Sequence, residues 1–261
     1  MMIAPRGVPP GLPRRAGLAL TDGALARLVD DAPDVGALRL DLRAAARAPL
    51  DTLERARGAH PLVLRDPEAP LTPHARPSRA LLARLAELGA RFRQQAVVLR
   101  IEDAARAPDA LSMARLARGL RLARAAAESA VLVEADGPAA LAWADAVIEA
   151  EAGFLLNLAA LVSRGVEPAL LPREAVGAVQ LGALCRRAGP DGGAETYACA
   201  APRVSPALWP RFAALVAEAG PMPTFIDAGD GGPRWPLALA DAEAADHVLL
   251  TGGAARTACA L

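Results

Sequence analysis

The chain has 261 residues, of which 53% are hydrophobic and 22% are charged. This length and apolar content allow one large core and exclude a largely disordered chain. The 29 basic and 29 acidic residues leave no net charge, so there is no electrostatic reason to expect nucleic acid or an anionic membrane as a partner. All 29 basic residues are arginines, because the sequence contains no lysine.

Features of the two ends and the cysteines predict a cytoplasmic protein that does not enter the membrane. Residues 1–15 contain arginines but no continuous apolar stretch, so we expect a flexible leader and not a secretory signal. Residues 251–261 are expected to form a C-terminal tail. No apolar run reaches the roughly 18 to 20 residues of a membrane span. The three cysteines are odd in number and lack metal-site spacing, which is typical of a reduced compartment; they are Cys185, Cys199 and Cys259.

Eight short apolar runs alternate with helical segments between residues 16 and 250. The runs cover 17–20, 35–42, 61–65, 96–101, 130–134, a stretch from Phe154 to Asn157, a stretch carrying Gln180, and 223–227. The helical segments cover 24–29, 50–57, 78–93, 112–128, 138–150 and 208–219. The runs lack hairpin turns between them, which favours parallel βα units. The count of eight predicts a single (β/α)₈ TIM-type barrel over residues 16–250.

Polar residues stand at the ends of these apolar runs, where a core would not need them. The carboxyl ends of the strands of such a barrel meet at one mouth, which is where barrel enzymes place their sites. A loop expected over residues 186–206 adds a further acidic residue. The candidate site residues are therefore Arg39, Arg65, Arg100, Glu134, Asn157, Gln180, Glu195 and Asp227.

The order of these segments and the residues in them resemble those of the multinuclear non-heme iron-dependent oxidative enzymes. The resemblance rests on FLLNLAALVSRGVEPALLPREAVGAVQL, on GPMPTFIDAGD and on the trio Arg39, Asp41 and Leu42, and it runs from about residue 17 to residue 246. It implies a barrel that binds two or three iron ions through histidines and carboxylates. It also implies an enzyme that modifies peptides, often at cysteine, during natural-product maturation.

Most positions that hold iron ligands in that family hold other residues here. Arg39 and Arg65 stand at histidine positions, and Arg100 with Ile101 stands at a Glu-His pair. Asn157 replaces an aspartate and Gln180 a histidine, while Glu195-Thr196-Tyr197 replaces an Asp-Thr-His; only Glu134 and Asp227 keep carboxylates. A guanidinium has no lone pair to give a metal, and the three histidines, His60, His74 and His247, lie elsewhere. We therefore expect no metal and no iron cofactor.

Three interpretations of the mouth remain open. In the first, guanidinium–carboxylate pairs replace the ions as crosslinks, and the protein is a non-catalytic scaffold that binds a peptide or a partner protein of a peptide-modifying complex. In the second, the arginines hold a small anionic substrate, and Glu134 or Asp227 is the acid/base of an isomerase or lyase. In the third, Mg²⁺ or Mn²⁺ binds the oxygen ligands that survive, namely Glu134, Asn157, Gln180, Glu195 and Asp227. An open cavity with an unpaired arginine beside Glu134 would favour the second.

Three further features have structural explanations. Cys199 has no histidine base nearby in the sequence, so an inert or exposed thiol is expected. The run Gly229-Asp230-Gly231-Gly232 lacks the lysine of a P-loop and is expected to form a turn. The tryptophans are expected in the core or in helix packing; they are Trp143, Trp209 and Trp235.

Overall fold

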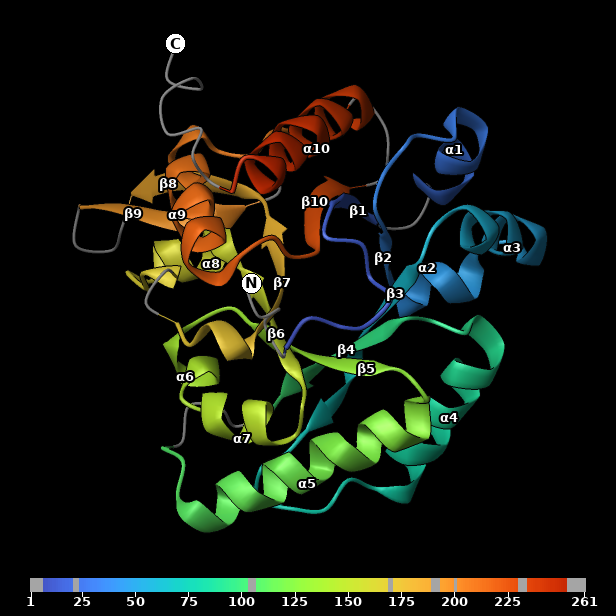
Figure 1. Ribbon diagram of the computed structural model, residues 1–261, viewed down its shortest axis with the longest axis vertical. Helices are drawn as coiled ribbons and strands as arrows, with labels where there is room; N and C mark the ends of the chain where they lie inside the picture. Colours follow the sequence, from blue (N-terminus) through green and yellow to red (C-terminus); the bar gives the residue numbers. More distant parts are fainter. Residues whose placement is uncertain are drawn as a thin grey trace.

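Eight parallel strands close into a barrel in the computed structural model, which describes residues 7–20, 24–102, 107–168, 171–188, 193–199, 201–229 and 234–252 (Figure 1). Around the barrel the strand order is β1-β10-β7-β6-β5-β4-β3-β2, so each strand pairs with its sequence neighbour in the barrel and β1 closes on β10. The strands are β1 (Ala16–Leu20), β2 (Leu38–Asp41), β3 (Leu62–Leu71), β4 (Ala96–Ile101), β5 (Ala130–Ala135), β6 (Gly153–Asn157), β7 (Val176–Leu181) and β10 (Thr224–Gly229). The predicted (β/α)₈ TIM-type fold is confirmed.

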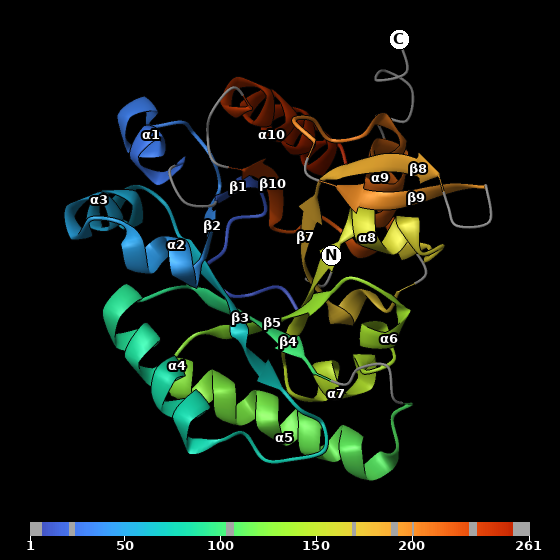
Figure 2. The same ribbon diagram turned by 180° about the vertical axis from the view of Figure 1, so that it is seen from behind.

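Helices surround the barrel on the outside, as the two opposite views show (Figures 1 and 2). They are α1 (Ala24–Asp31), α2 (Leu42–Arg47), α3 (Leu50–Ala59), α4 (Arg79–Phe92), α5 (Ala110–Ala127), α6 (Pro138–Leu141), α7 (Ala144–Glu149), α8 (Leu158–Ser163), α9 (Trp209–Ala219) and α10 (Trp235–Leu250), with 3-10 turns η2 (Arg173–Ala175) and η3 (Pro206–Leu208). No helix in the described ranges is both long and apolar enough to cross a bilayer.

Local sequence signals explain where the two long helices of the outer wall begin. Ser78 precedes α4 and its hydroxyl accepts a hydrogen bond from the Leu81 amide at 3.1 Å. Asp109 precedes α5, and its carboxylate accepts a hydrogen bond from the Ser112 amide at 2.7 Å; in return the Asp109 amide donates to the Ser112 hydroxyl at 3.0 Å. Such caps satisfy amide groups that have no partner within the helix. Both helices were predicted to within two residues at each end.

Small and aliphatic side chains fill the interior of the barrel. Its central cluster is Leu12, Ala19, Ala37, Val63, Ala96, Val98, Leu132, Leu155, Ala178 and Phe225. Leu12 precedes β1 and reaches this cluster from the floor of the barrel. The Gly7 carbonyl lies only 2.2 Å from where a Cβ of Gly153 would be and 2.6 Å from that of Gly177, an approach only glycine permits. Residues 7–12, expected as part of a flexible leader, thus pack against the floor.

The outer core lies between the strands and the helices and contains the largest aromatic side chains. Trp143 and Trp235 are fully buried there, which confirms that prediction. Trp209 is partly buried and meets the Phe212 ring edge-on, with the ring centres 6.4 Å apart. The tryptophans therefore belong to the scaffold.

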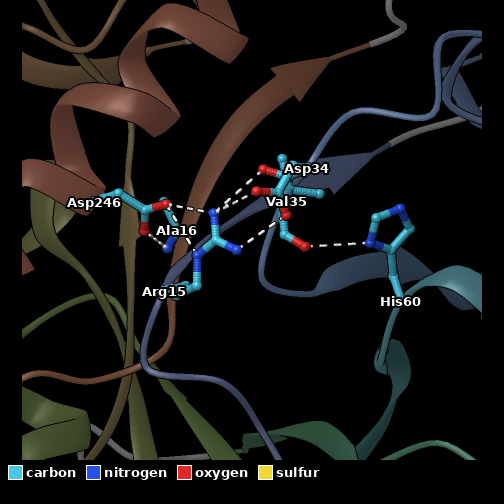
Figure 3. Close-up of polar contacts among 6 residues, drawn as sticks. All are labelled: Arg15, Ala16, Asp34, Val35, His60 and Asp246. Carbon is cyan, nitrogen blue, oxygen red and sulfur yellow. Dashed lines mark hydrogen bonds and ion pairs between the residues drawn. The ribbon is translucent and has the colours of Figure 1, made fainter.

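A polar cluster ties the start of β1 to the last helix of the barrel (Figure 3). The Arg15 guanidinium contacts Asp34 at 3.0 Å and Asp246 of α10 at 3.0 Å, and Asp246 also accepts the Ala16 amide. The hydrogen bond from Arg15 lowers the pKa of the Asp34 carboxyl. His60 Nδ1 lies 3.2 Å from the Val35 carbonyl nearby. All of these groups lie at the amino ends of strands, away from the mouth, so this cluster has a structural role.

An antiparallel hairpin, β8 (Ala183–Ala188) with β9 (Ala194–Cys199), follows β7 outside the barrel. We expected a loop over residues 186–206 and no hairpins, and both expectations were wrong. Arg187 pairs with Glu195 at 2.9 Å, lowering the pKa of that carboxyl, and lies over the Tyr197 ring. The Gly and Pro content of the sequence between residues 186 and 206 suggested a loop, while the cross-strand pairs that stabilise the hairpin become evident only from the register.

A disulfide joins Cys185 to Cys199 across this hairpin, with Cα atoms 5.8 Å apart. The expectation of an inert or exposed Cys199 thiol was therefore wrong. Disulfides persist in oxidising environments, so the cysteines no longer argue for a reduced compartment, and the cytoplasmic location stays a prediction.

Reducing this disulfide is expected to loosen the hairpin and leave the barrel folded. The hairpin lies outside the barrel, so the crosslink chiefly limits local opening. In a Cys185→Ser/Cys199→Ser variant, hydrogen exchange at residues 194–199 should accelerate, while exchange in β5 and β6 should not change. Equal acceleration in β5 would contradict a local role.

Candidate active site at the barrel mouth

Strand alternation places the predicted residues on the inner face of the barrel, at its mouth. Side chains two residues apart on a strand point the same way. Ala37, Val63, Val98, Leu132, Leu155, Ala178 and Phe225 belong to the interior cluster. Alternation predicts that the residues two positions further along are directed inward too. Six of them are buried or half-buried, namely Arg39, Arg65, Glu134, Asn157, Gln180 and Asp227, whereas Arg100 is exposed.

Strand register brings the charged members of this set close together. Arg39 of β2 and Asp227 of β10 both align with Ala19 of β1, so they stand at the same level on either side of that strand. Asp41, at the end of β2, aligns with Arg65 of β3. Asp41, which follows Arg39 in the sequence but was not among the candidates, therefore belongs to the site.

Arg65 is held by two carboxylates. Its Nη2 donates to both oxygens of Glu134, at 2.9 and 3.0 Å, and its Nε donates to Oε2 at 3.3 Å. Its Nη1 donates to Asp41 at 3.4 Å. Burial alone would lower the pKa of Arg65, but the two carboxylates outweigh burial and raise it. The bidentate pair with Glu134 is a strong form of ion pair. Together with the contact to Asp41 it crosslinks β2, β3 and β5.

Arg39 is in the opposite situation. The residue is only 9% exposed, and its buried Nε has no hydrogen-bond partner. Within the described part of the chain its guanidinium forms no ion pair. Burial lowers the pKa of Arg39, although Asp41, Glu134 and Asp227 attract its charge; Arg65 repels it. A buried donor without a partner carries a free-energy penalty of about 1 to 3 kcal/mol, so its presence needs an explanation.

Two of the predicted residues have other roles or surroundings than expected. Glu195 lies on the outer hairpin and pairs with Arg187, so its prediction as a mouth residue was wrong. Arg100 is exposed on β4, where Pro70 of β3 aligns with it beyond an irregularity in the pairing. We expected it to face the carboxylates, yet no ion pair links it to any described residue.

The two neutral candidates occupy neighbouring strands. The Asn157 side chain accepts the Ala160 amide at 3.1 Å and caps α8, which accounts for its presence structurally. Gln180 is half-buried on β7 and aligns with Asn157 on one side and with Phe225 on the other. Gln180 therefore adds an uncharged polar group to the wall that includes Asp227.

The residues of the mouth do not fit the iron ions that the family resemblance implies. Among the described residues, no group of three or more His, Cys, Asp or Glu could hold a metal ion. Arg39 and Arg65 bring positive charge to the mouth, and both oxygens of Glu134 are engaged by Arg65. Residues 21–23, 103–106 and 230–233, which follow β1, β4 and β10, lie outside the described residues.

Comparisons with known proteins support the fold and nothing finer. No protein-family model matches the sequence, and no curated protein matches it. A xylose isomerase domain containing protein from Salmonella typhimurium aligns with TM-score 0.57 and 12% identity over 92% of this chain and 99% of that one.

A xylose isomerase-like TIM barrel protein from Mycobacterium smegmatis, in complex with magnesium, aligns with TM-score 0.56 and 13% identity over 97% and 100%. The catalytic domain of a family GH18 chitinase from the fern Peteris ryukyuensis aligns with TM-score 0.51 and 11% identity over 89% and 99%. At such identities these proteins share the TIM-barrel fold with this chain, and fold alone does not determine function.

Proposed function

We propose that the protein binds a small carboxylate at the barrel mouth, with Arg39 as the primary contact. The observation that carries this proposal is the buried Nε of Arg39, which has no hydrogen-bond partner among the residues that the structure describes. A guanidinium only donates hydrogen bonds, and its planar fork matches a carboxylate or a phosphate. An anionic ligand would supply the missing acceptors, so its binding would remove the free-energy penalty that the unpaired donor causes in the free protein.

The charge of the mouth favours a monoanion over a phosphate dianion. Among the described groups that act electrostatically on Arg39, three are carboxylates, Asp41, Glu134 and Asp227, and one is the Arg65 guanidinium. A second negative charge on the ligand would increase the repulsion from these carboxylates. A carboxylate with a polar, uncharged remainder next to Gln180 fits this balance better.

A second candidate function is an isomerase or lyase that acts on the same anion, with Asp227 as its acid/base. The supporting observation is that Asp227 and Arg39 stand at one level on either side of β1. Glu134, the other predicted acid/base, has both oxygens bound by Arg65 and is poorly suited to proton transfer. An Asp227→Asn variant should then retain binding and lose turnover.

The scaffold function suggested by the family resemblance is compatible with the same contact. The Arg65 crosslink to Glu134 and Asp41 has the form expected when ion pairs replace metal ions. A peptide partner could present its C-terminal carboxylate to Arg39. This role in peptide maturation stays a prediction.

An Arg39→Met variant tests the proposal through two opposite effects. Methionine keeps the unbranched stem and removes the unpaired charge. The free energy of unfolding of the variant should therefore be about 1 to 3 kcal/mol higher than that of the wild type. It should also lose the thermal stabilisation that acetate, lactate or benzoate gives the wild type. Differential scanning calorimetry at rising carboxylate concentration, with phosphate as the dianion, measures both effects.

The matched control is Arg100→Met, which removes an exposed arginine from β4, two strands away from β2, and should retain the carboxylate response. The proposal fails if Arg39→Met responds to carboxylates as the wild type does. It also fails if the wild type responds to none of the three and Arg39→Met is less stable than the wild type.

A further inference from the structure

A cavity of about 400 Å³ lies on the outer wall, between the segment after β3 and helix α5. Helix α5 runs along the outside of the molecule in both views (Figures 1 and 2). A volume of this size falls in the range of sites for small molecules. The residues that line the cavity and matter here are His74, Arg76, Leu111, Arg115, Arg118 and Leu122.

Four of these residues form one stripe along α5. Leu111, Arg115, Arg118 and Leu122 are spaced by four, three and four residues, which places them on one face of a helix. The two leucines are exposed, Leu111 by 59% and Leu122 by 38%, and they flank the two arginines. The cavity thus has a charged centre with apolar surface at both ends.

The arginines of this cavity are uncompensated, whereas other arginines on the same helix are paired. Arg121 contacts Glu149 at 3.2 Å, and Arg124 contacts Glu151 at 2.6 Å. By contrast, Arg115 donates to the His74 carbonyl at 3.4 Å and forms no ion pair with a described residue. Arg76 and Arg118 form no ion pair with any described residue, and no described acidic residue lines the cavity.

His74 adds a polar group without a partner. Its Nε2 is buried and has no hydrogen bond within the described part of the chain. The residue lines the cavity, but this nitrogen is shielded from solvent, so His74 contributes the surface of its ring to the wall. Three positive charges, one imidazole and two leucines therefore surround one hollow.

We propose that this cavity is a second ligand site, which binds a small amphiphilic anion such as an aryl or alkyl phosphate monoester. The phosphate would contact Arg76, Arg115 and Arg118, and the apolar group would cover Leu111 or Leu122. The uncompensated charge favours a dianion here, in contrast to the carboxylate-rich mouth. The two sites therefore differ in the ligand class that they select.

Isothermal titration calorimetry of the protein with phenyl phosphate tests this site. An Arg115→Gln/Arg118→Gln variant should bind at least about tenfold more weakly, because two charge-assisted contacts are lost. The matched control is Arg121→Gln/Arg124→Gln, which removes the same charge from the same helix and should bind within about twofold of the wild type. Inorganic phosphate and benzyl alcohol, which carry only half of the recognised features, should each bind more weakly than phenyl phosphate.

Three outcomes would overturn the proposal. Equal weakening in both double variants would mean that general surface charge is responsible. Phenyl phosphate binding no tighter than inorganic phosphate would remove the role of the leucines. Loss of phenyl phosphate binding in Arg39→Met would place the ligand at the mouth instead, a result that leaves the carboxylate proposal intact.

Discussion

A Glu134→Gln variant is expected to lose about 3 to 5 kcal/mol of unfolding free energy, because it breaks a largely buried ion pair and leaves a charge without its partner. Glu134 and Arg65 side chains are 14% and 26% exposed, and three hydrogen bonds join them. A glutamine offers one acceptor oxygen and no charge, so Arg65 keeps only one full partner, Asp41, at 3.4 Å. Urea denaturation at pH 7 measures the difference.

The control for this substitution is Glu195→Gln, which makes the same chemical change in the exposed pair with Arg187. It should leave the denaturation midpoint nearly unchanged, because water and salt screen an exposed pair. Adding Arg65→Met to Glu134→Gln should restore part of the loss, since the uncompensated charge is then removed. Equal losses from Glu134→Gln and Glu195→Gln would show that the mouth pair does not crosslink the barrel.

An Asp241→Asn variant is expected to lose about 2 to 4 kcal/mol, because a fully buried carboxylate then stops pairing with an arginine. Asp241 of α10 is 1% exposed and accepts from Arg203 at 2.7 and 2.8 Å and from the Val204 amide at 2.7 Å. Asparagine has one acceptor oxygen in place of two. If this oxygen accepts the Val204 amide, the NH₂ group faces Arg203; if it accepts from Arg203, the hydrogen bond to the Val204 amide is lost. Chemical denaturation gives the magnitude.

The location of this loss distinguishes it from a general weakening of the protein. The Ser205 hydroxyl accepts the Leu184 amide at 2.7 Å, so the segment held by Asp241 also anchors β8. Hydrogen exchange in residues 183–188 should therefore accelerate in Asp241→Asn. The control is Glu167→Gln, whose partner Arg211 is exposed and whose effect should stay below about 1 kcal/mol. Unchanged hydrogen exchange at β8 in Asp241→Asn would show that Asp241 does not stabilise the hairpin.

Two arginines of the mouth show how one residue type can serve stability or binding. Arg65 has its charge neutralised by Glu134 and Asp41, and it stabilises the barrel. Arg39, one strand away, is buried with no ion pair to a described residue, and we expect it to destabilise the free protein. Functional sites commonly retain such unfavourable groups because the ligand makes them favourable. Arg39→Met should therefore raise the free energy of unfolding, whereas Glu134→Gln, which removes the main partner of Arg65, should lower it.

The sequence by itself determined the barrel. Each strand is a short apolar run that is compatible with burial on both faces, and each run ends in polar residues or turn signals. Period-two alternation also carries Arg39, Glu134, Asn157, Gln180 and Asp227 inward at the mouth. The helices without an apolar stripe were missed: α8 has four consecutive buried residues, and α10 is apolar on most sides, so neither shows a helical period.

Only the tertiary structure decided which charges meet. Asp41 reaches Arg65 because β2 and β3 pair in one register, and Glu134 reaches it from β5, on the far side of β4 and 69 residues further along the chain. The same arrangement gives Arg39 no ion pair with a described residue, while Glu195 and Cys199 lie in an outer hairpin. Hydrogen bonds need atoms placed within a few tenths of an ångström, and strand pairing across a closed barrel sets those positions. Sequence spacing places a side chain on a face, but it does not determine that side chain's partner.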